Sequence, residues 1–375
     1  MAKLGDIATY INGYAFKPSD WSTEGLPIIR IQDLTGSSYK TNKYNGDYDK
    51  KYEVNNGDIL ISWSASLGVF VWKNDKAVLN QHIFKVIFNK KVVDKDFFVY
   101  QVENILRKAQ NSVHGATMKH LTKPVFDSLD FYLPLIEEQK RIAKQLKLIN
   151  LLIDHRNDQI KKLDLLVKSR FIEMFGDPIT NDKELPVEPL GKHIELLGGF
   201  AFKSTGFAKE GIPVLRIGNI NSGYFKSDNL PFWKYDKALD RYLLYPGDLA
   251  ISLTGTVGKD DYGNICRLGN DYPRYYLNQR NAKLILKDTV LPEFIRTLLK
   301  NKKVKDKIVN TGVGIRQANI SNKSILELEV PIPNLAEQKQ FASLVTQVDK
   351  SKLAIQQSLY ELETLKKSLM QQYFG

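Results

Sequence analysis

One short motif occurs twice in the chain, as GYAFK at Gly13–Lys17 and as GFAFK at Gly199–Lys203. Other stretches return in the same order in the second half: GLPIIRI (25–31) as GIPVLRI (211–217), GDILIS (57–62) as GDLAIS (247–252), LNQ (79–81) as LNQ (277–279), and EQK (138–140) as EQK (337–339). The offset is 186 residues at the opening motif and 199 residues from Gly115/Gly314 onward. Ordered self-similarity of this kind indicates two copies of one unit, the second with longer loops.

The matched and unmatched stretches differ in composition. The matched runs PIIRI, PVLRI and DILIS are rich in β-branched residues and are predicted to be strands. The unmatched stretches, 31–57 against 217–247 and 62–79 against 252–277, are rich in Gly, Asn, Asp, Tyr and Lys, which is typical of surface loops. We therefore expect the shared segments to be scaffold, with the aromatic residues of GYAFK and GFAFK packed in each core. The unshared segments form the adjustable surface.

Each copy ends in a predicted long helix with apolar residues at alternating steps of four and three. These are Ile142, Leu146, Ile149, Ile153, Ile160, Leu163 and Val167 in the first copy, and Phe341, Val345, Val348, Ile355, Leu359, Leu362 and Leu369 in the second. Arg156, Lys352 and Lys366 interrupt the pattern. A 3.5-residue repeat over about five heptads predicts a coiled-coil seam, and ~36 residues give a rod of ~54 Å. We expect the two helices to pair; separate packing on each domain is the alternative.

Helix-end signals and the repeat together give a division of the chain. Asn334 with Glu337 predicts a helix start, and Gly176 followed by Asp-Pro predicts a helix end. The predicted fold is α+β: two tandem mixed α/β domains, each followed by a long helix, with the helices paired as an antiparallel coiled coil. The parts are residues 1–135 (first domain), 136–176 (first helix), 177–334 (linker and second domain) and 335–375 (second helix).

Charge is the most informative bulk property. The chain has 54 Lys and Arg against 42 Asp and Glu, a net charge of +12 and a pI of about 9.3, which produces a positive field that attracts a polyanion. Cys266 is the only cysteine, which excludes an internal disulfide and fits the reducing cytoplasm where we expect the protein. No apolar run approaches the ~20 residues that cross a bilayer, so no membrane partner is expected. Charge alone also fits a protein that is merely basic.

Catalytic and cofactor motifs are incomplete. Gly258-Lys259 resembles the end of a P-loop, but Leu253 stands in the place of the first glycine and Asp260 replaces Ser or Thr. Gly312-Val-Gly314 is followed by Gln317 where a dinucleotide fingerprint needs a third glycine. The five histidines are scattered without a metal-ligand spacing. We therefore predict a chain that is not an enzyme and carries no cofactor or metal of its own.

The remaining candidates are groups that bind phosphates and base edges. The shared set, expected to contact phosphates, consists of Lys17, Lys203, Arg30 and Arg216 with the hydroxyls Ser64 and Ser66 of SWSASLG (62–68) and Thr254 and Thr256 of SLTGTVG (252–258). An ordinary tight turn after a strand is the alternative for these two hydroxyl-rich loops. Two copies that read different half-sites must differ at their base-reading positions. Base readers are therefore expected among the unshared residues.

A second pair of loops supplies the candidate base readers. HGATMKHLTK (114–123) and TGVGIRQANISNK (311–323) contain Lys119, His120, Arg316, Gln317 and Asn319, side chains that pair with guanine or adenine edges. The preceding segment KNKKVKDK (300–307), predicted to be a helix, would contact the DNA backbone through residues such as Lys303. A solvated helical face is the alternative for this segment.

The duplicated G-[YF]-A-F-K, G-x-P-[IV]-[IL]-R-I, G-D-[IL]-x-I-S and P-x-x-x-E-Q-K motifs, each set followed by a long helix, resemble the specificity (S) subunit of type I restriction–modification systems. The resemblance covers nearly the whole chain. It implies two target-recognition domains that each read one half of a bipartite site in double-stranded DNA, and helices that set the gap between the halves.

The resemblance also implies partners. Two modification subunits would dock on the helices and bring S-adenosylmethionine and adenine-N6 methylation, and a restriction and motor subunit would join for cleavage. Arg141, Lys144 and Lys147 on the first helix are then candidate docking residues. The alternative function is a stand-alone DNA-binding nuclease or methyltransferase with a dispersed site. A DNA mimic is disfavoured because it would be acidic.

Overall fold

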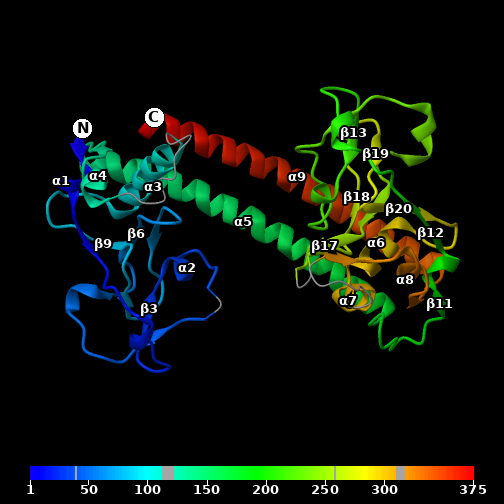
Figure 1. Ribbon diagram of the computed structural model, residues 1–375, viewed down its shortest axis with the longest axis horizontal. Helices are drawn as coiled ribbons and strands as arrows, with labels where there is room; N and C mark the ends of the chain where they lie inside the picture. The colour runs from blue at the N-terminus through cyan, green and yellow to red at the C-terminus, as the bar shows by residue number, and fades with distance from the viewer. Residues whose placement is uncertain (39, 112–121, 257–258, 310–316) are drawn as a thin grey trace. The chain divides into compact units, whose positions relative to one another are not determined.

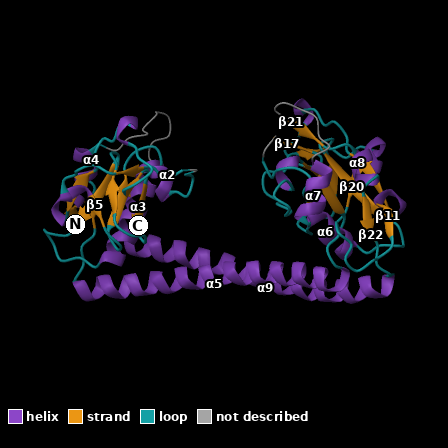
Figure 2. Ribbon diagram, turned by 90° about the horizontal axis from the view of Figure 1, so that it is seen from below, coloured by secondary structure: helices purple, strands orange, loops and turns teal. Residues whose placement is uncertain are grey.

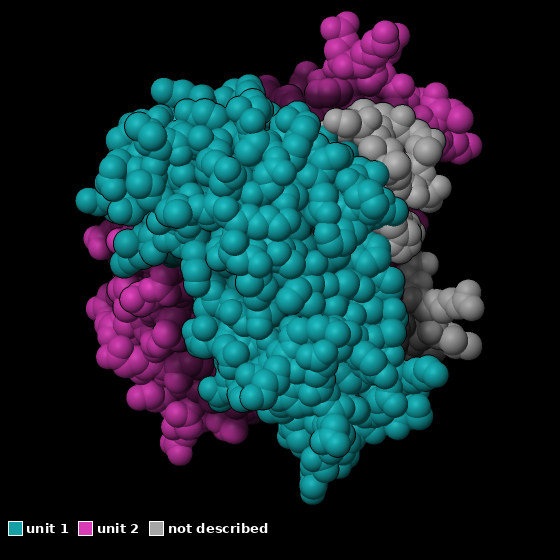
Figure 3. Space-filling model, turned by 90° about the vertical axis from the view of Figure 1, so that its left-hand side faces the viewer, with its two compact units in different colours: residues 1–157, 357–375 teal, residues 158–356 magenta. Residues whose placement is uncertain are grey.

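A computed structural model of the chain describes residues 1–38, 40–111, 122–256, 259–309 and 317–375 (Figure 1). Contacts group them into two units, residues 1–157 with 357–375 (unit 1) and residues 158–356 (unit 2), which Figure 3 distinguishes by colour. Each unit contains one domain and one half of each long helix. The helices therefore do not form bodies of their own.

Unit 1 is built on two four-stranded sheets. The first has the antiparallel order β2 (Thr9–Asn12), β9 (Ile83–Ile87), β6 (Ile59–Ser62) and β7 (Gly68–Val71). The second has the order β4 (Lys43–Tyr44), β3 (Leu26–Ile29), β8 (Ala77–Leu79) and β5 (Glu53–Val54), in which β3 and β8 are parallel. The unit is completed by β1 (Ala2–Lys3), paired with β10 (Asp130–Phe131), and by α1 (Leu4–Ile7), α2 (Ile31–Leu34), α3 (Lys95–Asn111) and α4 (Lys123–Asp127).

Unit 2 repeats both sheets. One has the order β12 (Ile194–Gly198), β20 (Asn281–Leu286), β16 (Leu249–Ser252) and β18 (Ile265–Arg267); the other has the order β14 (Phe232–Trp233), β13 (Ile212–Leu215), β19 (Tyr275–Leu277) and β15 (Leu243–Leu244), again with one parallel pair, β13 and β19. The remaining elements are β11 (Val187–Pro189) paired with β22 (Glu329–Pro331), β17 (Thr254–Thr256) paired with β21 (Gln317–Asn319), and α6 (Pro292–Lys300), α7 (Lys302–Val309) and α8 (Asn322–Leu326). The predicted duplication and the predicted mixed α/β class are confirmed.

The opening motif lies where two repeated segments cross. A Cβ atom on Gly13 would lie 2.0 Å from the carbonyl oxygen of Asn80, and one on Gly199 would lie 2.3 Å from that of Asn278. Only glycine permits this approach, which brings GYAFK or GFAFK against the Leu-Asn-Gln triplet of the same copy. The aromatic residues only partly fulfil the expectation of a core position. Phe16 and Phe202 are buried, but Tyr14 is 47% exposed.

The two long helices are α5 (Ile136–Phe175) and α9 (Leu335–Phe374), each about 60 Å long. The Asn334 side chain accepts a hydrogen bond from the Glu337 amide (3.0 Å), and Gly176 ends α5 with a φ of +74°, as the sequence predicted. The predicted seam residues are buried in the first turns of each helix and half-buried from there to its end, whereas their neighbours are mostly exposed.

The helices pair in both units, in opposite directions along the chain (Figure 2). In unit 1 the first turns of α5 share a core with the last turns of α9, where Ile142 and Leu146 join Phe374. In unit 2 the end of α5 packs on the start of α9, with the Phe171 and Phe341 ring centroids 5.6 Å apart. The predicted antiparallel pairing is confirmed within each unit. No helix in the described part of the chain is both long and apolar enough to span a membrane.

Candidate nucleic-acid interface

Two of the predicted contact segments in unit 2 form one structure. β17 and β21 are antiparallel, and Thr254 lies opposite Asn319 while Thr256 lies opposite Gln317. Directly opposed residues project from the same face of a sheet, so Thr254 and the exposed Asn319 are neighbours on one face. Figure 2 shows this two-stranded ribbon at the end of unit 2 away from α9.

The ribbon corrects the prediction of a loop at residues 252–258. Thr254–Thr256 is a strand, because β21 supplies hydrogen-bond partners and threonine favours extended backbone. The Thr256 hydroxyl and amide both donate to the Asp261 carboxylate, at 3.1 and 2.8 Å. The Thr256 hydroxyl is therefore occupied within the chain, and Asn319 and Thr254 are the better placed of the described candidates.

Several predicted base readers cannot be placed. Lys119, His120 and Arg316 lie outside the described residues, and of Gln317 only the backbone, in β21, is described. Their assignment as base readers therefore stays a prediction.

The corresponding hydroxyl-rich loop of unit 1 is arranged differently. Ser64 is 4% exposed, so its side chain is not available to a phosphate in this structure, contrary to the prediction. Ser66 is exposed. The Trp63 indole donates to the Asn12 side chain (3.1 Å) and stacks on the Phe84 ring at 5.7 Å. The loop is therefore held by an aromatic anchor, with Ser66 at its surface.

The shared arginines have a structural contact that the sequence did not indicate. The Arg30 guanidinium donates to the Lys40 carbonyl (2.7 Å), and the Arg216 guanidinium donates to the Asn229 carbonyl (2.7 Å). Both carbonyls belong to unshared loops. In each copy the strand ends directly before the arginine, although the predicted strand included it. The Arg30 amide donates to the Asp33 side chain and the Arg216 amide donates to the Asn219 side chain, so the chain begins a helical turn there instead. In each domain, the arginine that the copies share therefore holds a loop whose sequence differs between the copies.

The shared lysines are exposed. Lys17 and Lys203 each precede a short 3₁₀ turn, and both have exposed side chains. No ion pair of either lysine occurs among the described residues. Both remain available to a phosphate oxygen.

The basic segment at residues 300–307 is not one helix, which corrects the prediction. It is divided at Asn301, whose side chain accepts from the Lys303 amide (3.0 Å) and begins α7. Lys303 forms an ion pair with Asp177, and Lys305 is 9% exposed and paired with Asp260. Only part of this segment presents free positive charge.

The candidate docking residues lie together on α5 in unit 1. Arg141, Lys144 and Lys147 are exposed, and Lys147 forms a 2.8 Å ion pair with Asp96, which raises the pKa of the lysine. Beside them the sequence analysis missed a second apolar stripe, separate from the seam: Leu148, Leu151 and Leu152 are 56%, 51% and 41% exposed. The spacing of three and four residues was the signal for it. An exposed stripe of this kind marks a candidate protein interface.

The described residues contain no group of three or more His, Cys, Asp or Glu side chains that could hold a metal ion. What the geometry provides is a duplicated β-rich domain, a polar ribbon and paired helices. This is the architecture of a tandem recognition protein, and the family model for the type I restriction modification DNA specificity domain matches residues 1–163 and 193–364. The chain belongs to this family.

Two curated relatives and two solved structures agree with that family over the whole chain. The type I restriction enzyme MjaVIII specificity subunit of Methanocaldococcus jannaschii is 26% identical, over 99% of this chain and 90% of its own length. The EcoBI specificity subunit of Escherichia coli is 22% identical, over 99% and 84%. The S subunit structure from M. genitalium (TM-score 0.57, 15% identity, 98% and 94% covered) and a type I system structure (0.54, 16%, 100% and 96%) share the fold.

Proposed function

We propose that this chain is the non-catalytic specificity subunit of a type I restriction–modification complex, in which each domain reads one half of a bipartite DNA site. The observation that carries the proposal is the β17–β21 ribbon. It joins the shared hydroxyl-rich segment Thr254–Thr256 to the unshared segment Gln317–Asn319, on a frame that the copies share, and exposes Asn319. Asn319 on this surface is suited to adenine edges, and the net charge of +12 favours a polyanion.

The first experiment tests assembly. The purified chain is mixed with its modification subunit, S-adenosylmethionine and genomic DNA, and methylated adenines are mapped by sequencing. The expected result is adenine-N6 methylation at one bipartite sequence, and only in the mixture. Methylation by the chain alone, or metal-dependent cleavage by the isolated chain, would instead support the stand-alone enzyme and contradict the proposal. In the cell we place the complex with DNA in the cytoplasm, joined by a restriction and motor subunit.

We further propose that α5 and α9 set the gap between the half-sites. A helix of about 60 Å exceeds the ~34–36 Å that separates half-sites one DNA turn apart. Deleting seven residues from each helix, 154–160 and 356–362, keeps the 3.5-residue seam and removes ~10 Å. The mapped gap should shorten by about three base pairs. Lys161→Ala, on an exposed helix position, is the control that keeps the length. An unchanged gap in the shortened chain refutes this role.

The docking proposal concerns the exposed face of α5 in unit 1. Modification subunits dock there, with Arg141, Lys144 and Lys147 at the rim and the Leu148, Leu151 and Leu152 stripe as the apolar centre. The double variant Leu148→Glu/Leu152→Glu should abolish co-elution with the modification subunit. Gln347→Glu on α9, at the position that corresponds to Leu148, is the matched control. Co-elution that survives the double variant places the interface elsewhere.

The repeat does not duplicate this stripe. α9 carries Gln347, Lys350 and Ser351 where α5 carries Leu148, Leu151 and Leu152. If two modification subunits bind, as the family resemblance implies, the second uses a surface of different chemistry. Light scattering of the reconstituted complex gives the stoichiometry.

A further inference from the structure

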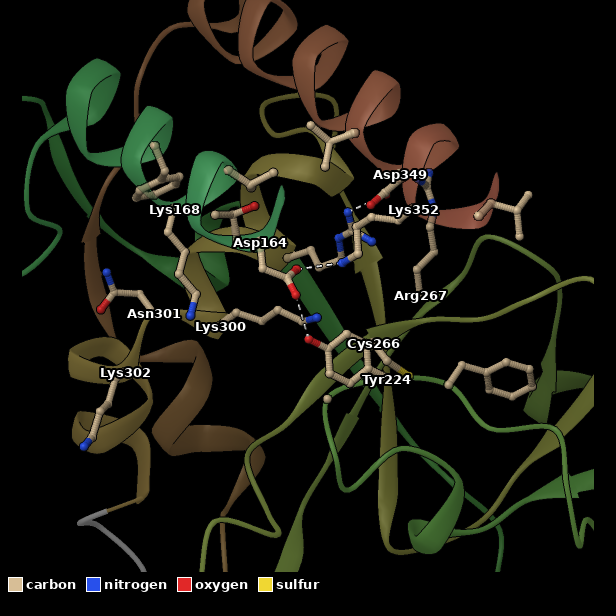
Figure 4. Close-up of a pocket in the computed structure, with 18 of the residues that line it drawn as sticks. Asp164, Lys168, Tyr224, Cys266, Arg267, Lys300, Asn301, Lys302, Asp349 and Lys352 are labelled. Carbon is tan, nitrogen blue, oxygen red and sulfur yellow. Dashed lines mark hydrogen bonds and ion pairs between the residues drawn. The ribbon is translucent and has the colours of Figure 1, made fainter. Parts of the chain in front are cut away.

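Unit 2 contains a cavity of about 830 Å³ between the second domain and the two long helices. Its apolar wall comes mainly from the helices, with Phe171 and Ile172 on α5 and Val348 and Leu353 on α9. The domain contributes Tyr224 and the ends of α6 and α7 (Figure 4). Among the described side chains, none from β17 or from Asn319 of β21 lines the cavity.

The cavity is lined by more positively than negatively charged side chains. Seven basic and three acidic side chains line it. Four of the basic ones form ion pairs: Lys352 with Asp164 (2.6 Å), Arg296 with Asp349 (2.6 Å), Arg267 with Glu293 (2.9 Å) and Lys303 with Asp177. The other three, Lys168, Lys300 and Lys302, have no acidic partner within the described part of the chain. Because Glu293, which does not line the cavity, neutralises Arg267, three of the lining positive charges are left without an acidic partner among the described residues, beside the apolar wall.

Lys300 is the centre of this excess. Its ammonium lies 4.7 Å from the centre of the Tyr224 ring, and Lys352 lies 5.6 Å from the same ring. The Tyr224 hydroxyl donates to Asp164 (3.2 Å), which fixes the ring beside the two lysines (Figure 4). Desolvation of the Lys300 ammonium, and then the positive charges of Arg296 and Lys352, lower the pKa of Lys300 to about 8. Packing like charges in this way is unfavourable unless an anion offsets it.

The other unit provides an internal comparison. The shared Glu-Gln-Lys triplets align the helices, so that Asp164 corresponds to Glu363 and Lys168 to Lys367. Phe97 and Asn104 align with Phe294 and Asn301, which places Glu103 at the position of Lys300.

The corresponding space in unit 1 is smaller and neutral. It has a volume of about 380 Å³ and is lined by three acidic and three basic side chains: Glu103, Asp154, Glu363, Arg107, Lys366 and Lys367. The frame therefore forms a recess in both units, but only that of unit 2 carries excess positive charge.

We propose that the unit 2 cavity binds an organic phosphate, an anion with a multiply charged phosphate group and an apolar body. The phosphate lies between Lys300 and Lys168, while Lys302 points away from them at the edge of the cavity (Figure 4), and the body lies against the helix wall at Phe171 and Leu353. Cys266, which also lines the cavity, takes no part, because burial raises the pKa of its thiol to about 12.

Isothermal titration of the full chain with ATP, pyrophosphate and adenosine, without divalent cations, tests this site. One ATP should bind, more tightly than pyrophosphate because the apolar wall adds to its affinity, and adenosine should bind weakly. Lys300→Gln and Lys168→Gln should each weaken ATP binding about tenfold or more. Lys367→Gln, at the unit 1 position that corresponds to Lys168, should not change it.

The opposite outcomes are equally clear. Absence of ATP and pyrophosphate binding, or binding that survives both cavity variants, overturns the site. Equal affinities for ATP and pyrophosphate overturn the organic body. A further titration with duplex DNA distinguishes the source of the phosphate. If Lys300→Gln weakens duplex binding by the same factor as ATP binding, and pyrophosphate competes with the duplex, the DNA backbone is the ligand. Site-specific methylation by the same variants with the modification subunit tests the proposed function separately.

Discussion

Units 1 and 2 use one frame of two four-stranded sheets, and they differ most where that frame meets solvent. Gly13 and Gly199 make the same close contact with a backbone carbonyl in both units. Glu103 and Lys300, at corresponding positions beside the helices, have opposite charge. The comparison separates residues that build the domain from those that are free to acquire a partner.

The largest effect is expected at the shared glycines. Gly13→Ala and Gly199→Ala place a methyl group against a backbone carbonyl that cannot move, and each should destabilise its own unit by about 3–5 kcal/mol. Gly198→Ala, next to Gly199 but with no atom within 4 Å of the added carbon, is the control and should change stability by under about 0.5 kcal/mol. Urea denaturation of each variant measures this. A mild effect at either shared glycine would show that the close contact relaxes.

The second effect concerns DNA and rests on the proposed function. Asn319→Ala should remove discrimination at one base pair of one half-site, a loss of about 1–3 kcal/mol or roughly 5–150-fold. Ser66→Ala in unit 1 should weaken binding less, by about 1 kcal/mol, and without changing the preferred base, because a hydroxyl at that loop would contact phosphate. Binding to duplexes changed one base pair at a time measures both. Equal loss at both half-sites after Asn319→Ala would mean that the ribbon has a structural role.

Much of the fold could be predicted because repetition supplies two independent readings of each element. The helix starts at Ile136 and Leu335 lie where the pattern placed them, and the strands Leu26–Ile29 and Ile212–Leu215 overlap the predicted runs PIIRI (27–31) and PVLRI (213–217) but end before the arginines. Local signals failed where tertiary partners decide the outcome. Thr254–Thr256 is a strand because a segment far along the chain pairs with it, and no local pattern contains that information.

The candidate site was less predictable, for a related reason. The sequence indicates which side chains could touch DNA, but burial depends on neighbours. Ser64 and Ser66 have the same chemistry, yet one is buried and the other exposed. Arg30 and Arg216 are committed to the Lys40 and Asn229 carbonyls because loop closure brings those oxygens to them. The unit 2 cavity is lined by side chains from five separate helices and strands, so no residue spacing in the sequence predicts it.

The third prediction compares two ion pairs of α5 in unit 2. Asp164→Asn leaves Lys352, only 14% exposed, without its carboxylate partner and should cost about 1–3 kcal/mol. Glu173→Gln removes the partner of Arg170 at an exposed pair and should cost under about 0.5 kcal/mol. Denaturation of unit 2 in low and high salt separates them, since salt screens the exposed pair more. Equal costs would mean that Lys352 finds another acceptor in the seam.

The smallest effect follows the charge of Lys300. Its pKa of about 8 in the folded chain lies below the ordinary 10.5, so the unfolded chain binds more protons between these values, and stability rises with pH across that window. The charged groups that act on it are Arg296, Lys352 and Asp164, with Cys266 beside them.

Lys300→Gln should therefore raise the Tm of unit 2 at pH 7 by only about 1–2 °C, since solvent screens a side chain that lies open to the cavity. The gain should shrink from pH 8 to 10.5 and vanish only above that window, where Lys300 is neutral in both states. Lys367→Gln in unit 1, whose side chain is exposed on α9, should show no such pH-dependent gain. Thermal unfolding of both variants from pH 7 to 10.5 makes the comparison. A Lys300→Gln chain that is less stable than the wild type at pH 7 would mean that this lysine stabilises the fold. The two cavities would then differ in packing and not in an unpaired positive charge.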